Sequence, residues 1–94
     1  MITEITPVFV KTIGKPLEEG KYYISKEYGI AIHLCACGCG EETVMDFKPL
    51  HADGWTLVEN ADGTISFTPS IGNWNGQSPY HAHYYITNNK IVWV

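Results

Sequence analysis

The amino-acid sequence predicts an all-β or β-dominated fold: a single small domain of six to eight short antiparallel strands with a zinc knuckle. Three observations predict the strands. Proline and glycine interrupt the chain throughout, so no helical periodicity is sustained. The segments between them are rich in aromatic and β-branched residues, which suit a pleated sheet. Asp62-Gly63 and Asn88-Asn89 each separate two such segments, and these residues tolerate the positive φ of a tight hairpin turn.

The first half of the chain contains four expected strands. Val8–Val10 is a short β-rich run, and Pro16–Gly20 after it fits either one helical turn or a loop. Lys21–Ser25 combines two tyrosines with an isoleucine, which favours a strand. Gly29–Leu34 alternates with a period of two, so its isoleucines lie on one face and His33 and Cys35 on the other. Residues 43–47, which follow the cysteines, form the fourth expected strand.

The second half of the chain is expected to form two hairpins. Trp55–Glu59 and Thr64–Thr68 flank the Asp-Gly turn, and Tyr84–Ile86 and Ile91–Val94 flank the Asn-Asn turn. Residues 64–89 contain no Lys, Arg, Asp or Glu but several aromatic side chains. Such a segment fits either the filling of a small core or a surface adapted to a partner.

Composition excludes several classes of protein. A chain of 94 residues predicts one domain, residues 1–94, whose small core would benefit from a bound metal. Its 45% hydrophobic residues argue against disorder, and no apolar run approaches the ~20 residues of a membrane-spanning helix. The chain has six Lys, no Arg and a net charge of −4, which argues against nucleic-acid binding. No secretory signal is evident in the first ten residues, so we expect a cytoplasmic location.

Three cysteines lie within five positions: Cys35, Cys37 and Cys39. An odd and crowded set is not typical of a disulfide framework, and a bridge between residues two apart fits badly. Free thiols agree with a reducing compartment. Thiolates are soft donors that favour zinc, and Gly38 and Gly40 allow the tight backbone turns of a metal knuckle.

The remaining ligands of a four-coordinate Zn²⁺ site are expected from His81 and His83. Residues two apart on a strand point to the same side, so both imidazoles can converge on one ion. Two ligand sets are open: Cys37 and Cys39 with both histidines, or all three cysteines with His83. The other two histidines, His33 and His51, are expected to be surface residues or hydrogen-bonded core residues.

Three segments resemble a small bacterial and phage family of unknown function. They are Cys35-Ala36-Cys37-Gly38-Cys39-Gly40, Pro69-Ser70-Ile71-Gly72-Asn73-Trp74, and His83-Tyr84-Tyr85-Ile86 with a closing Val92-Trp93. The family's pattern is Cys-Pro-Cys-Gly-Cys-Gly, Pro-Ser-Ile-Gly-Asn-Trp and Cys-x-Ser-His-Tyr-Trp-Ile. The resemblance implies a metal-binding module, and some members are similar to companions of ubiquitin-like conjugation genes. Here Tyr80 stands in place of the later cysteine, and His81 is the expected substitute ligand.

The leading functional hypothesis is a metal-stabilised binding or adaptor module without catalysis. Its protein partner would contact the aromatic segment around Trp74. The sequence shows no phosphate-binding loop, no Ser or Cys nucleophile motif with an ordered base, and no His-Glu-x-x-His helix. One alternative is a small zinc-dependent hydrolase with an open coordination position, for which Glu41, Glu42 or a spare histidine would be the general base. Another is a phage-encoded inhibitor of a host defence protein.

Overall fold

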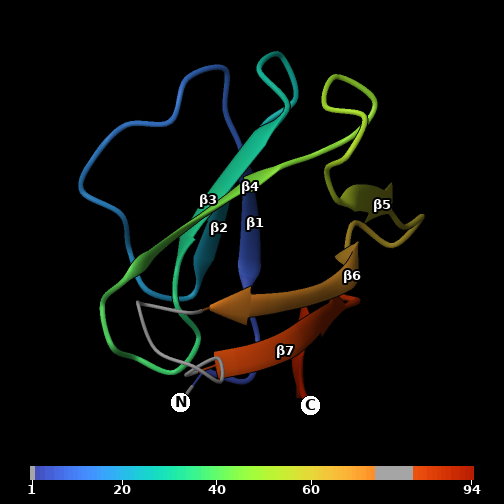
Figure 1. Ribbon diagram of the computed structural model, residues 1–94. Coiled ribbons are helices and arrows are strands. Elements are labelled where there is room, and N and C mark those ends of the chain that lie inside the picture. The colour runs from blue at the N-terminus through green and yellow to red at the C-terminus, as the bar shows by residue number, and fades with distance from the viewer. Residues whose placement is uncertain (1, 74–81) are drawn as a thin grey trace.

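The computed structural model describes residues 2–73 and 82–94, which form two four-stranded sheets (Figure 1). The strands are β1 (Thr6–Phe9), β2 (Lys21–Ser25), β3 (Ile30–Leu34), β4 (Glu42–Asp46), β5 (Thr56–Glu59), β6 (Ile65–Asn73), β7 (Ala82–Thr87) and β8 (Lys90–Trp93). Their order is β1-β2-β3-β4 in one sheet and β5-β6-β7-β8 in the other. The prediction of an all-β fold of short strands is therefore confirmed.

One detail differs from the expected arrangement. Strand β1 pairs with β2 in parallel, whereas all other strand pairs are antiparallel. Parallel pairing requires a long connection between the two strands. Residues 10–20 provide it, because they return the chain from the end of β1 to the level of its first residue, where Lys21 lies opposite Thr6. For the segment Pro16–Gly20 the sequence left a helical turn and a loop open, and the structure has the loop, with a turn at its end. Within the described ranges there is no helix, and hence none that could span a membrane.

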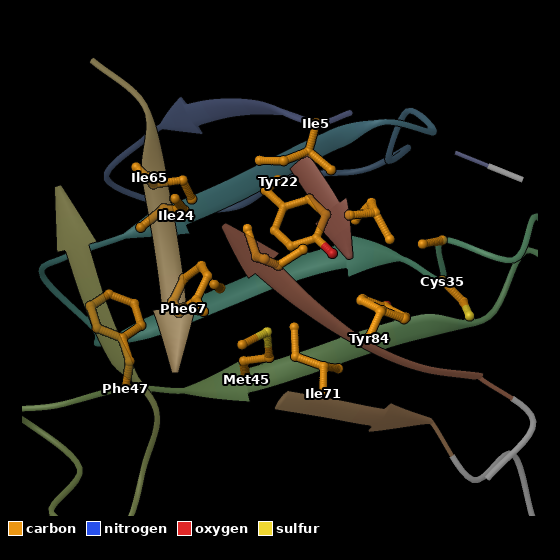
Figure 2. Close-up of a cluster of buried hydrophobic side chains, with 14 of the residues drawn as sticks. Ile5, Tyr22, Ile24, Cys35, Met45, Phe47, Ile65, Phe67, Ile71 and Tyr84 are labelled. Atoms are coloured by element: carbon orange, nitrogen blue, oxygen red, sulfur yellow. The ribbon is translucent and has the colours of Figure 1, made fainter. Parts of the chain in front are cut away.

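The two sheets enclose one hydrophobic core (Figure 2). Ile24 and Met45 come from the first sheet, Phe67 and Ile86 come from the second, and all four are fully buried. Burying a side chain of this size stabilises a fold by about 1.5–3 kcal/mol. Figure 2 also shows Cys35 at the same end of the core as the Tyr84 ring. The loop that carries the cysteines is therefore anchored by the core itself.

The alternation predicted for β3 is confirmed, and its buried face is the one that carries His33 and Cys35. The His33 ring stacks on Tyr22 of β2, with centroids 3.8 Å apart, and its Nε2 atom lies 2.7 Å from the Tyr84 hydroxyl. Burial lowers the pKa of His33 to about 3, so the ring is neutral at pH 7. His33 is thus a hydrogen-bonded core residue.

The N-terminal segment Ile2–Ile5 links the two sheets. The Ile2 amide donates to the carbonyl of Ala36, in the cysteine loop, at 3.0 Å. The Ile5 amide donates to Asn89, and the Ile91 amide donates back to Thr3, both at 2.8 Å. This segment therefore connects the cysteine loop to the β7–β8 hairpin through backbone hydrogen bonds.

Both predicted hairpin turns are present. Gly63 adopts a φ of 88°, which its lack of a side chain permits, and the Thr64 amide and hydroxyl both donate to the Asp62 carboxylate. Asn88 and Asn89 adopt φ values of 51° and 65°. Two consecutive left-handed residues are the requirement of a tight hairpin turn, and asparagine meets it better than most residues.

Candidate functional site

Strand β6 is interrupted by a bulge that carries Ser70. Phe67 lies opposite Ile86 and Ile71 lies opposite Tyr84, so four steps along β6 match only two along β7. The sequence predicts a strand that ends at Thr68, but β6 continues beyond the bulge to residue 73. Bulges redirect side chains out of the regular ladder and are frequent beside active sites.

The bulge brings the Ser70 hydroxyl to the imidazole of His83. Ser70 Oγ and His83 Nε2 are 2.7 Å apart, and both residues are half-buried. His83 lies on β7 opposite Gly72, on the side of the strand that faces away from the core. This distance is that of a serine nucleophile and its general base. The arrangement allows the imidazole to accept the hydroxyl proton when the oxygen attacks an electrophile.

The backbone of Ser70 is held by Trp55. The indole Nε1–H donates to the Ser70 carbonyl at 3.3 Å. Trp55 is fixed in turn to the end of β4, because its amide donates to Asp46 at 2.9 Å and its carbonyl accepts from Lys48 at 2.8 Å. The preceding Gly54 is required for this approach, since a Cβ atom there would lie 2.3 Å from the Asp46 carbonyl oxygen. Trp55 thus connects the bulge to the other sheet.

The three cysteines form a compact cluster after β3. Their Sγ atoms all lie within 4.8 Å of one another, and those of Cys35 and Cys37 are 3.4 Å apart. Thiolates bound to one zinc ion at about 2.3 Å in a tetrahedral site would be separated by about 3.8 Å, so the cluster fits such an ion. The Gly38 amide donates to the Cys35 carbonyl at 3.1 Å, and Gly38 adopts a φ of 90°. This turn brings the thiols together.

The predicted histidine ligands are His81 and His83. Among the described residues, the group of potential ligands close enough to share an ion consists of the three cysteines. His83 is not part of that group, and its Nε2 atom contacts Ser70. His81, Tyr80 and Trp74 lie outside the described residues. The His51 side chain contacts the carbonyl of Tyr28 at 3.2 Å.

The pairing of Ser70 with His83 is not evident from the sequence alone. Both residues fall within segments that resemble the family pattern, but the resemblance assigned a role only to His83, as a metal ligand. The available signal is the Pro69-Ser70 step within a strand-like segment. Proline cannot donate to a central ladder, so it indicates a bulge at this position.

Comparison with known proteins gives one family. A family model described as "Bacterial ubiquitination-like system serine protease (BubE)" matches residues 9–94. No curated protein and no solved structure gives a significant match to the chain. The match agrees with the expected link to ubiquitin-like conjugation genes, whereas the family's name specifies a protease and not an unknown function. The match covers most of the chain, which therefore belongs to the BubE family of bacterial ubiquitination-like systems.

Proposed function

We propose that this protein is a serine hydrolase that cleaves a polypeptide, with Ser70 as the nucleophile and His83 as the general base. The 2.7 Å contact between Ser70 Oγ and His83 Nε2 carries the proposal. The name of the family supports it, since that name describes a serine protease. The protein partner expected from the sequence is then the substrate.

The reaction follows from the geometry of the pair. Ser70 Oγ attacks the carbonyl carbon of the scissile amide while His83 Nε2 accepts the hydroxyl proton. The protonated imidazole then gives this proton to the leaving amine, and the acyl group remains on Ser70 as an ester. Water then attacks the ester carbonyl while His83 accepts a proton from it. The bond between the acyl carbon and Ser70 Oγ breaks, His83 returns the proton to Oγ, and the carboxylic acid product is released.

The cysteine cluster has a structural role in this proposal. Cys35, Cys37 and Cys39 would hold Zn²⁺, as thiolate-rich sites commonly do, and the ion would stabilise the loop after β3. Metal binding would then contribute to the folding of the domain. This proposal differs from the zinc-dependent hydrolase that the sequence offers as an alternative. In that hydrolase the nucleophile would be a metal-activated water, whereas here it is the Ser70 hydroxyl.

Covalent labelling tests the assignment of Ser70. Full-length protein is treated with a small fluorophosphonate reagent, and the adduct is located by mass spectrometry. We expect one adduct, on Ser70, that is lost in Ser70→Ala and forms at least about 100-fold more slowly in His83→Ala. The matched control is Ser66→Ala, a serine of β6 on the regular side of the bulge, which should label like the wild type.

Two results would contradict the proposal. One is the absence of any adduct in folded wild-type protein. The other is an adduct on Ser70 that forms at the same rate with and without the His83 imidazole. Either result would favour the non-catalytic adaptor expected from the sequence.

A further inference from the structure

An exposed apolar pair lies beside the proposed catalytic pair. Tyr85 follows His83 by two residues on β7, so both side chains leave the same face of the strand about 6.5–7 Å apart. Tyr85 is 44% exposed. On β8 the residue directly opposite is Val92, which is 47% exposed. On the other side of β7 lies the β6 bulge with Ser70.

The strands beside the proposed catalytic pair carry few charged side chains. Strands β6, β7 and β8 carry one charged residue, Lys90, which lies at the hairpin end opposite Thr87. A chain segment that approaches Ser70 over this face therefore meets an aromatic ring and an aliphatic side chain. Such a surface favours an uncharged, apolar side chain and disfavours a charged one, which would lose hydration without gaining a partner.

We propose that Tyr85 and Val92 form the subsite for an apolar side chain of the polypeptide substrate, adjacent to the scissile bond. This inference rests on the proposed function. The occupant is an extended polypeptide segment, the substrate of the proposed hydrolase, whose alternate side chains are spaced by about 6.5–7 Å, as expected for His83 and Tyr85 on β7. With the scissile carbonyl at Ser70, a side chain one or two residues away reaches the Tyr85 ring.

An aromatic–aliphatic pair across two strands also stabilises a sheet, so activity alone does not test the proposal. The quantity to measure is the substrate preference. Two peptides are compared that differ only by Leu or Asp at the residues flanking the cleaved bond. We expect the wild type to cleave the Leu peptide with at least a tenfold higher kcat/KM. The preference should fall severalfold or more in Tyr85→Ser and in Val92→Ser.

The matched control is Val58→Ser on edge strand β5, whose valine is 41% exposed and lies opposite Ser66. This variant should keep the wild-type preference. Val58→Ser should also label with the small fluorophosphonate at the wild-type rate, because β5 lies outside the proposed subsite. An unchanged preference in Tyr85→Ser and Val92→Ser, or no preference in the wild type, would overturn the proposal.

A binding measurement separates this inference from the proposed function. The two peptides carry a fluorophore, and their affinity for Ser70→Ala is measured by anisotropy with and without the Tyr85→Ser change. In one outcome Ser70 never reacts, but the Leu peptide binds at least tenfold more tightly than the Asp peptide and loses this advantage in Tyr85→Ser. The subsite is then supported and the catalytic assignment is wrong. If Ser70 reacts but both peptides bind and are cleaved equally, the subsite is wrong and the catalytic assignment stands.

Discussion

His33 on β3 and Tyr84 on β7 are joined across the core, with the Nε2 atom 2.7 Å from the Tyr84 hydroxyl oxygen. His33 stands two residues before Cys35, and Tyr84 is the neighbour of His83. The strand that leads into the cysteine cluster and the strand that carries the proposed base are thus in direct contact. The contact is fully buried, so its hydrogen bond is not replaced by water when it is broken.

Tyr84→Phe should destabilise the protein. The change leaves a buried His33 nitrogen without this partner, which costs about 1–3 kcal/mol. Urea unfolding monitored by fluorescence measures the free energy of unfolding of each variant. Tyr85→Phe is the matched control, because it removes a hydroxyl from the adjacent, exposed tyrosine and should change stability by less than about 0.5 kcal/mol. Equal stabilities of the two variants would contradict the role of the buried contact.

Trp55→Phe should slow the reaction of Ser70 more than it weakens substrate binding. Phenylalanine keeps an aromatic ring but has no N–H to donate to the Ser70 carbonyl, so the bulge is held less firmly. We expect kcat and the rate of fluorophosphonate labelling to fall about tenfold, with KM within twofold of the wild type.

The control for this change is Trp93→Phe, whose ring packs against Tyr84 at a centroid distance of 5.2 Å. It should reduce stability while leaving the labelling rate of folded protein unchanged. A Trp55→Phe protein that labels at the wild-type rate would remove the positioning role.

Removal of the metal should destabilise the fold without removing the nucleophile. We expect protein purified without added metal to contain one equivalent of zinc. A strong chelator, or Cys37→Ser, should lower the melting temperature by more than about 10 °C, because binding free energy is part of the folding free energy. His51→Ala is the control and should melt like the wild type. Elemental analysis below half an equivalent in folded, reduced protein would exclude the metal site.

Acid should release the metal, since protons compete with it for the thiolates. Chelated protein that remains folded at low temperature should still form the Ser70 adduct. Loss of the adduct from such folded protein would instead favour a metal-dependent hydrolase.

The Asp62 carboxyl should titrate below its ordinary value of 3.8. Hydrogen bonds from the Thr64 hydroxyl and amide lower the pKa of this carboxyl, because they favour its ionised form. The stabilising effect is therefore present above the unfolded pKa and is lost as the pH falls through the folded one. NMR titration of the carboxyl carbon should show a higher midpoint in Thr64→Val. An identical midpoint in both proteins would argue against these hydrogen bonds.

Local chemistry explains which parts of the fold are predictable from sequence. Asn88 and Asn89 tolerate positive φ, so their hairpin follows from two adjacent residues. The three cysteines are equally local, because the backbone needs only the turn at Gly38 to bring their thiols together. In both cases the residues that come together are only a few positions apart in the chain, so turn chemistry is sufficient to predict the local structure.

The contact between Ser70 and His83 is a different case. It depends on the bulge between Phe67 and Ile71, which changes the register of β6 against β7. A shift of one residue turns every side chain to the opposite face, so strand periodicity alone cannot say which serine meets which histidine. The tether from Trp55 is likewise set by packing between elements far apart in the chain.

The backbone link formed by Ile2–Ile5 has a consequence for how the molecule opens. Its hydrogen bonds reach Ala36 in the cysteine loop after β3 and Asn89 in the turn between β7 and β8, so these two segments cannot move apart without breaking them. The amides of Ile2, Ile5 and Ile91 should then exchange with solvent deuterium as one cooperative unit, at a common opening free energy. Loosening of the cysteine loop would therefore also loosen the β7–β8 hairpin, which carries His83, before the rest of the core opens.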